Sequence, residues 1–246
     1  ISGCSARANG ADGIQADNGS TISGCSARAN GDDGIKAGSG STISDCSAYN
    51  NLNYGIVAGS GCTISDCSAY NNTGDGIEVA GGSKITGNTC DNNGYNGDGA
   101  GIHVTGSQNR IDSNNVTDND RGIDVDVSDN YVADNTVKGN TDNYDIAPGN
   151  QLNILLCEVP EGVDWPASVK FAGTLICTNT SANGITVNAD DVTIDMDGHA
   201  LVGPGINSHH GIYQGPDRRN LRVHNGKVVQ WRGTDKGGVY AGGKNN

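Results

Sequence analysis

The residues of this chain that suit acid–base chemistry concentrate between positions 195 and 240, where histidine, arginine and lysine stand among tyrosine and tryptophan. Chemistry on an acidic sugar polymer needs such a set, because a cation must neutralise the sugar carboxylate while one group removes a proton and another supplies one. The candidate catalytic residues are His209, His210, Arg218, Arg219, Arg232 and Lys236. The candidate carbohydrate-binding residues are Arg222, Trp231 and Tyr240. The alternative for these cations is a solvated charged face.

Three aspartates offer a second kind of site. Asp124, Asp126 and Asp129 lie near an expected turn, and carboxylate oxygens are ligands that Ca²⁺ prefers. The sequence predicts no cofactor, and calcium at these three aspartates is the alternative. The competing interpretation is an acidic face that keeps the protein soluble and prevents lateral pairing of sheets.

Four of the eight cysteines recur at one constant spacing: Cys4, Cys25, Cys46 and Cys67. Residues stacked on neighbouring strands lie within the Cα separation that a disulfide requires, so Cys4–Cys25 and Cys46–Cys67 disulfides are one interpretation. A column of buried thiols that act as small hydrophobes is the other. Cys157 and Cys177, outside the column, are the better disulfide candidates. A zinc site is disfavoured because there is no Cys-x-x-Cys pair.

A repeat must position these side chains. Isoleucine recurs with a period of ~21 residues, and after one longer interval the same spacing returns at Val132. The ladder consists of Ile1, Ile22, Ile43, Ile64, Ile85, Ile111 and Val132. Gly-Ile pairs, small residues and asparagines form three further ladders in the same phase. Apolar residues within a unit alternate with polar ones in runs of three to five, which predicts short strands separated by turns. Because one unit buries nothing alone, neighbouring units must stack about 4.8 Å apart around a narrow core.

The composition agrees with a thin core. Hydrophobic residues make up 34% of the chain and aromatic residues 4%, with a formal net charge of −13. No apolar run approaches the roughly 20 residues that a membrane-spanning helix needs. The acidic balance disfavours nucleic acid as a partner.

The units Ser-Thr-Ile-Ser-x-Cys-Ser-Ala-x-x-Asn-x-x-Asp-Gly-Ile-x-Ala resemble the right-handed parallel β-helix repeat family, which includes pectate-lyase-like and NosD-like proteins. The resemblance covers residues 1–150 and 182–246, where the segment from Asn183 to Leu201 is similar to the first coils of that family. It implies an all-β fold, a right-handed parallel β-helix (solenoid) of about ten coils. It also implies an extracellular, carbohydrate-rich setting. It implies no reaction, because one fold hosts many functions.

Three parts follow: regular coils over 1–150, a capping or connecting segment over 151–181, and coils with longer loops over 182–246. Compared with the family, the parts stand in a permuted or head-to-tail order. Residues 143–150 resemble the end of a family member, yet they precede residues 182–246, which resemble its first coils. The repeat phase passes from Asn246 to Ile1 without a slip. A circular permutant, one unit of a tandem array, or stacking of one copy on the next would each produce this continuity.

We predict an extracellular or cell-surface structural rod that self-associates head-to-tail into a filament or array. Its joining ends are Ile1, Ser2, Lys244, Asn245 and Asn246. The alternative is a polysaccharide lyase or epimerase, or a carbohydrate-binding β-helix, with an acidic polysaccharide as partner. The sequence does not decide whether the protein is an enzyme, and it favours the answer that it is not. The Asp-Pro-His signature of alginate epimerases and the Arg-x-Pro motif of pectate lyases do not occur.

Overall fold

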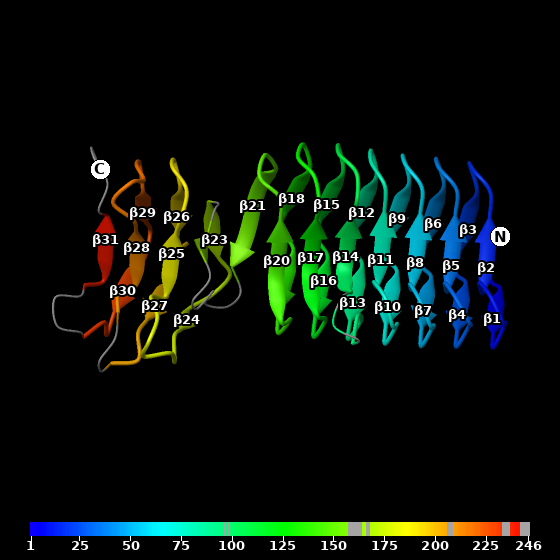
Figure 1. Ribbon diagram of the computed structural model, residues 1–246, viewed down its shortest axis with the longest axis horizontal. Helices are drawn as coiled ribbons and strands as arrows, with labels where there is room; N and C mark the ends of the chain where they lie inside the picture. Colours follow the sequence, from blue (N-terminus) through cyan, green and yellow to red (C-terminus); the bar gives the residue numbers. More distant parts are fainter. Residues whose placement is uncertain are drawn as a thin grey trace. The chain divides into compact units, whose positions relative to one another are not determined.

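The computed structural model of the chain describes residues 1–95, 97, 99–156, 164–165, 168–205, 209–232 and 237–241. It divides into two compact units, residues 1–151 and 152–246. All regular elements among the described residues are β-strands (Figure 1). Within these ranges there is no helix with the length and hydrophobicity that a membrane span requires.

Unit 1 consists of three parallel sheets, and each coil contributes one strand to each sheet, except that the first coil joins sheet A only by a bridge from Ser2 to Ser23. Sheet A contains β3 (Thr21–Ser23), β6 (Thr42–Ser44), β9 (Thr63–Ser65), β12 (Lys84–Thr86), β15 (Arg110–Asp112) and β18 (Tyr131–Ala133). Sheet B contains β1 (Ser5–Arg7), β4 (Ser26–Arg28), β7 (Ser47–Tyr49), β10 (Ser68–Tyr70), β13 (Thr89–Asp91), β16 (Asn115–Thr117) and β19 (Thr136–Lys138). Sheet C contains β2 (Ile14–Ala16), β5 (Ile35–Ala37), β8 (Ile56–Ala58), β11 (Ile77–Val79), β14 (Ala100–Val104), β17 (Arg121–Val125) and β20 (Asp142–Ile146).

Unit 2 has the same parallel architecture. Sheet D contains β22 (Asp164–Trp165), β25 (Ile185–Val187), β28 (Ile212–Gln214) and β31 (Val239–Ala241). Sheet E contains β24 (Leu175–Ile176), β27 (Ala200–Val202) and β30 (Lys227–Val229). Sheet F contains β21 (Gln151–Leu156), β23 (Val169–Phe171), β26 (Thr193–Asp195) and β29 (Arg222–His224). The described part of the segment 151–181 thus contributes strands to the sheets of unit 2.

The predicted all-β parallel β-helix and its regular repeat are confirmed. Its interior is made of like residues stacked in register, as Ile56 pairs with Ile35 on one side and Ile77 on the other, each fully buried. Burial of such a side chain contributes about 1.5–3 kcal/mol relative to exposure. Sheet C has seven strands and sheet D four, close to the expected ten coils.

Ladders of polar side chains fill the corners of the interior. The Asn51 Nδ2 donates to the Asn72 Oδ1 of the next coil at 2.9 Å, and the same oxygen accepts the Asn51 backbone N–H at 3.1 Å. The Asn72 Nδ2 continues the ladder to the Asn93 Oδ1, also at 2.9 Å. These amides are buried but satisfied, which removes the cost of enclosing polar groups.

The thiol column occupies a second such ladder. The backbone N–H of Cys25 donates to the Cys46 Sγ, and that of Cys46 to the Cys67 Sγ, both at 3.4 Å. The next step is an amide, since the Cys67 N–H donates to the Asn88 Oδ1 at 2.9 Å. Cys25, Cys46 and Cys67 are free and buried, which confirms the column of buried thiols at these three positions. Cys4 is free but exposed, and the predicted Cys4–Cys25 and Cys46–Cys67 disulfides are wrong.

The other disulfide candidate is not tested. Cys157 lies outside the described residues, and Cys177 is buried, with its Sγ 3.7 Å from the Asn179 carbonyl oxygen.

The glycine before each isoleucine has a packing role. A Cβ built on Gly55 would lie 2.5 Å from the Gly76 carbonyl oxygen and 2.7 Å from the Asn72 Nδ2. Glycine therefore lets the next coil approach at the strand spacing, which accounts for the Gly-Ile ladder.

We expect Ile56→Asp to lower the free energy of unfolding by at least about 4 kcal/mol, because it removes a buried side chain and leaves an unpaired charge in the core. Ser44→Lys, at a partly exposed position on sheet A, should change it by less than about 0.5 kcal/mol. Urea denaturation of both variants is the measurement. Equal effects would contradict the assignment of inward and outward faces.

Asn72→Ala should lower the free energy of unfolding by about 3 kcal/mol or more. The reason is that three buried groups would each lose a hydrogen-bond partner: the backbone N–H of Asn51, its side-chain amide and the Ala48 carbonyl. The matched control is Asn71→Gly, at an exposed position with φ of 55° that glycine adopts readily. Thermal unfolding followed by circular dichroism compares the two. A similar loss in both variants would mean that the buried ladder carries no special share of the stability.

Candidate functional site

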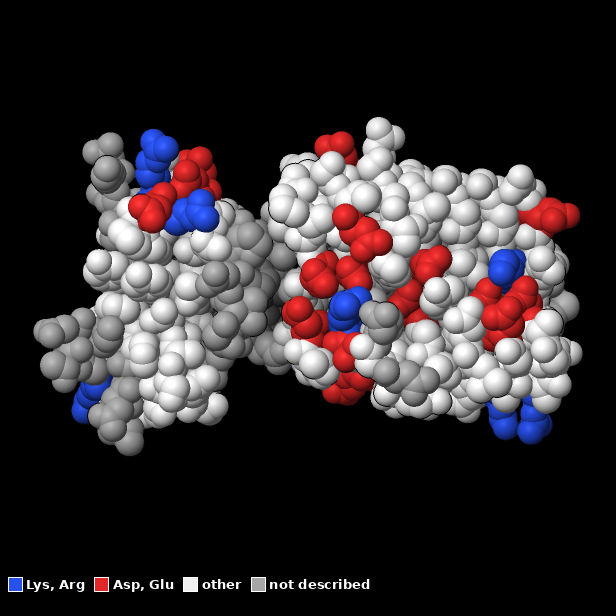
Figure 2. All heavy atoms as spheres, viewed as in Figure 1, with Lys and Arg blue, Asp and Glu red and all other residues white. Residues whose placement is uncertain are grey.

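Charged side chains form a row on the outer face of sheet C in unit 1. One column consists of the residues that follow the inward isoleucine, in register from Glu78 of β11 to His103 of β14, Asp124 of β17 and Asp145 of β20. A second column precedes the isoleucine and includes Asp75 and, two coils further on, Arg121. Figure 2 shows that acidic residues gather in patches along this face.

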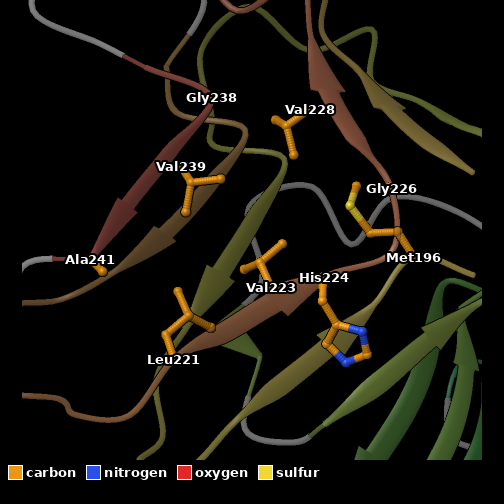
Figure 3. Close-up of a pocket in the computed structure, with 9 residues that line it drawn as sticks. All are labelled: Met196, Leu221, Val223, His224, Gly226, Val228, Gly238, Val239 and Ala241. Atoms are coloured by element: carbon orange, nitrogen blue, oxygen red, sulfur yellow. The ribbon is translucent and has the colours of Figure 1, made fainter. Parts of the chain in front are cut away.

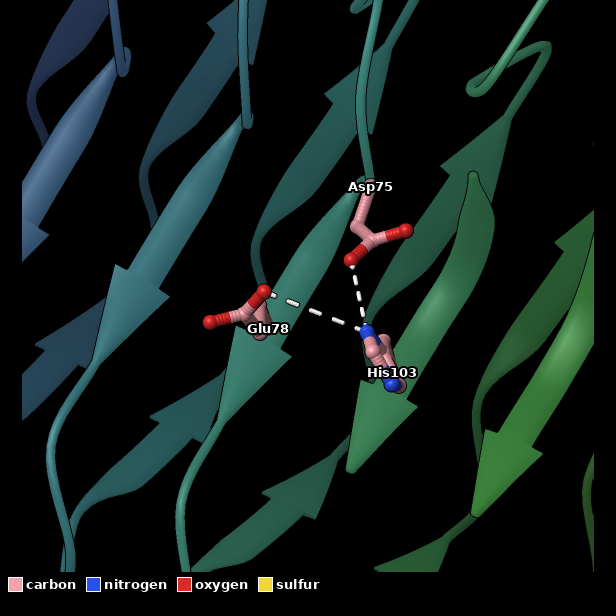
Figure 4. A group of neighbouring side chains, drawn as sticks. All are labelled: Asp75, Glu78 and His103. Carbon is pink, nitrogen blue, oxygen red and sulfur yellow. Dashed lines mark hydrogen bonds and ion pairs between the residues drawn. The ribbon is translucent and has the colours of Figure 1, made fainter. Parts of the chain in front are cut away.

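His103 is at the centre of the row. Its Nδ1 lies 2.9 Å from the Asp75 Oδ2 and 3.9 Å from the Glu78 Oε2 (Figure 4). Its Nε2 lies 3.2 Å from the Asp126 Oδ2. Asp75 is buried, and its other oxygen accepts the Ala100 backbone N–H at 2.6 Å. The imidazole is therefore held between an interior carboxylate and an exposed one.

These contacts set the charge of the imidazole. The hydrogen bond that His103 donates to the Asp75 carboxylate, against the opposing effect of burial, raises the pKa of His103 from 6.5 to about 9. At neutral pH the imidazole of His103 is therefore protonated on both nitrogens and positively charged.

Glu78 is a half-buried acid beside this ring. Burial and the nearby Asp75 charge raise the pKa of the Glu78 carboxyl, while the Tyr54 hydroxyl and His103 oppose that rise. Burial and the Glu78 charge in turn raise the pKa of Tyr54 to about 12, so its hydroxyl stays protonated. A carboxyl with a raised pKa is suited to donate a proton in mildly acidic solution.

Further carboxylates continue the row. Arg121 binds the Asp124 Oδ2 through Nη1 at 3.0 Å and lies 3.5 Å from the Asp145 Oδ2 through Nε. Burial raises the pKa of Asp124 and of Asp142. A smaller acidic group lies earlier in the same sheet, where Lys36 pairs with Asp33 at 3.2 Å.

The calcium prediction falls partly on this row. The structure brings Asp124 and Asp126 together with His103, with one possible ligand atom from each within 4.8 Å of the others, and Asp129 is not in that group. The donors fit calcium poorly, because one is an imidazole nitrogen and the Asp124 carboxylate already pairs with Arg121. Calcium stays a prediction.

Unit 2 holds the histidine candidates of the sequence. The His210 ring stacks on Tyr213 at a centroid distance of 5.5 Å and lies tilted by 34° against Tyr240 at 4.9 Å, and the two tyrosines stack at 5.3 Å. These tyrosines are register partners on sheet D. His209 is half-buried, and its Nδ1 has no hydrogen-bond partner among the described residues.

The cationic candidates are spread over several elements. Arg218 donates to the Asn188 Oδ1 at 2.9 Å, and the backbone N–H of Arg219 donates to Asp190. Arg222 and Arg232 are exposed, the former on β29. Lys236 lies outside the described residues.

Trp231 is an interior residue. It is 8% exposed, and its ring lies where a Cβ on Gly184, Gly203 or Gly211 would stand. It therefore offers little surface on which a sugar could stack.

A pocket of about 580 Å³ in unit 2 is lined mainly by apolar side chains, among them Leu221, Val223, Val228 and Val239 (Figure 3). Val223 and Val228 are register partners of the buried Ile194 and Leu201. The pocket is thus a continuation of the core, and among the described residues His224 is the one ionisable side chain that lines it.

Ile1 and Ser2 join the first coils. The Ile1 amino group donates to the Thr21 carbonyl at 2.7 Å, and Ser2 bridges to Ser23. The other predicted joining residues, Lys244, Asn245 and Asn246, lie outside the described residues. The head-to-tail contact and the permuted order stay predictions.

The family model described as "Right handed beta helix region" matches residues 1–109 and 37–246. The chain belongs to the right-handed β-helix family. This confirms the resemblance found in the repeat units.

Two solved structures are similar to the chain. The A-module of mannuronan C-5 epimerase from Azotobacter vinelandii aligns with 90% of this chain and 64% of its own length, at 19% identity and a TM-score of 0.53. The catalytic domain of a GH87 α-1,3-glucanase in complex with nigerose aligns with 92% of this chain and 55% of its own length, at 14% identity and a TM-score of 0.40. The chain spans less than two thirds of each of them, and the likeness concerns the fold. No curated protein matches the sequence.

The sequence-based prediction missed Asp75, Glu78 and His103. A signal was present, because all three lie in the two columns that flank the Gly-Ile ladder. It was obscured by an insertion between Ile77 and Ile102, which are nevertheless register partners.

Asp75→Asn should lower the pKa of His103 from about 9 toward its ordinary value of 6.5, because Asp75 is the main cause of the rise. In the unaltered protein the stability that comes from this pairing is complete below pH 6.5 and is lost as the pH rises through 9. The Asp75→Asn variant should not lose stability over this pH range. Asp126→Asn, the control, should lower the pKa less. Titration of the ring by NMR measures both, and an unchanged pKa in Asp75→Asn would contradict the assignment.

Proposed function

We propose that this protein acts on polysaccharide, with its acid–base centre at His103 on the outer face of sheet C. The observation that carries the proposal is the arrangement of one buried carboxylate, one imidazole and two more exposed carboxylates on an open parallel sheet. An extended polymer can lie across successive strands of such a face, which presents one side chain per coil in each column. An extracellular or cell-surface location is part of the proposal.

The reaction that these groups support best is hydrolysis of a glycosidic bond. Glu78, with its raised pKa, donates a proton to the leaving oxygen as the bond to that oxygen breaks. A water molecule attacks the anomeric carbon as that bond breaks, and the Asp126 carboxylate accepts the proton of this water. The His103 imidazolium pairs with the Asp126 carboxylate, and Asp75 positions His103.

The charge of the face favours a neutral glycan. Carboxylates outnumber cations around His103, where Asp75, Glu78, Asp124 and Asp126 face one histidine and Arg121. A uronate polymer would be repelled at this centre. This differs from the sequence-based alternative, which placed a site for acidic glycans in residues 199–240.

The sequence-predicted filament is not part of this proposal. It requires a contact between the two ends, and the predicted residues at one end lie outside the described ranges. The aromatic group of His210, Tyr213 and Tyr240 is compatible with sugar binding, because aromatic rings offer apolar surface with polar edges.

Glu78→Gln and Asp126→Asn should each reduce the hydrolysis rate by about 10²–10⁴-fold, because each removes a proton-transfer group. The rate of the unaltered enzyme should fall as the pH rises through the pKa of Glu78. Asp45→Asn removes an exposed carboxylate at a left-handed turn that asparagine tolerates, and should leave the rate unchanged.

The assay measures new reducing ends from a panel of neutral glucans of α and β linkage, with mannuronan as the acidic comparison. Epimerisation of mannuronan seen by NMR, without chain cleavage, would replace hydrolysis as the reaction. Full activity in Glu78→Gln and Asp126→Asn would contradict the assignment of the catalytic centre to sheet C.

A further inference from the structure

The outer face of sheet B carries a column of arginines and tyrosines that plays no part in the site on sheet C. Arg7, Arg28, Tyr49 and Tyr70 are the last residues of β1, β4, β7 and β10, and each is the register partner of the next. We name these four residues the Arg–Tyr stripe. It follows the direction in which the coils stack.

The stripe holds one guanidinium in place. The Arg28 Cζ lies 5.6 Å from the centre of the Tyr49 ring, and the Tyr49 and Tyr70 rings stack at 4.7 Å with 8° between their planes. The Arg28 Nε is buried and has no hydrogen-bond partner among the described residues. The Tyr49 ring fixes the plane of the guanidinium, and its terminal Nη groups, rather than the enclosed Nε, are the donors for an external oxygen ligand.

The two arginines are also uncompensated in charge. Other cations of unit 1, such as Lys36, Arg110 and Arg121, pair with aspartates at 2.7–3.2 Å. Arg7 and Arg28 form no ion pair with a described residue, although residues 1–150 contain 19 acidic and 7 basic side chains. Like charges on directly opposed strand positions destabilise a sheet, so an external anion between them would relieve that cost.

Hydroxyl groups lie beside the stripe. Ser26, Ser47 and Ser68 are the first residues of β4, β7 and β10, in register and partly exposed on the same outer face. The face thus offers guanidinium groups for carboxylates, with serine and tyrosine hydroxyls for neutral oxygens, along one line.

We propose that the Arg–Tyr stripe binds an acidic polysaccharide whose chain runs along the stack of coils. The guanidinium groups of Arg7 and Arg28 bind its carboxylates, and the hydroxyls bind its ring oxygens and alcohols. A linear polymer with both kinds of group fits a narrow stripe that repeats once per coil. A nucleic acid carries a denser charge and would meet the acidic surface of the rest of the unit. The inference goes beyond the proposed function, because it requires no reaction on sheet C.

The test is binding of sodium polygalacturonate to the full chain, measured by isothermal titration calorimetry at several salt concentrations. The double variant Arg7→Gln/Arg28→Gln should weaken binding at least 10-fold. Arg28→Lys should weaken it less, because the charge is kept but the planar fork is lost. The charge-matched control is Lys36→Gln/Lys84→Gln, which removes two exposed cations on sheets C and A and should change the affinity less than twofold.

Three results would overturn the proposal: equal weakening in the two double variants, equal binding of neutral dextran, or equal binding of single-stranded DNA. Circular dichroism of each variant shows whether it is folded. Since no turnover is measured, failure of this test leaves the proposed hydrolysis untouched, and failure of the hydrolysis assay leaves this inference untouched.

Discussion

The hydrogen-bonded register between successive coils is the constraint on which the rest of the molecule depends. Strands of three residues have little stability alone, and each coil is held because its inward isoleucine, its asparagine and its backbone groups meet the same groups in the next coil. The register survives an insertion. Asn93 and Asn119 are 26 residues apart, yet the Asn93 Nδ2 donates to the Asn119 Oδ1 at 2.9 Å. Tyr95, in the longer interval, is 65% exposed.

That insertion coincides with the candidate site. After it, β14, β17 and β20 have five residues instead of three, and His103, Asp124 and Asp145 stand on these longer strands. The first residue of β14, Ala100, donates its N–H to Asp75 and so helps to aim that carboxylate at the imidazole. Longer strands and an interior carboxylate together give His103 a fixed position, which catalysis by proton transfer requires.

Because register restricts only the inward positions, the outward columns are free to differ from one sheet to another. Sheet C carries carboxylates around one histidine, whereas sheet B carries arginines and tyrosines. One repeat therefore presents surfaces of opposite charge on the same unit. The two faces can therefore differ in charge without a change in the core.

The repeat made the fold readable from the chain alone, since four ladders in one phase specify strands, turns and a thin core without any long-range information. The thiol column and the asparagine ladder followed from the same spacing. The site did not follow, because Asp75, His103 and Asp126 are far apart in sequence and an irregular interval separates their coils. Likewise, nothing in the spacing showed that Trp231 faces the interior or that Arg28 rests on Tyr49. Those relations depend on which coils become neighbours and on which face each side chain leaves the strand, and stacking in three dimensions sets both.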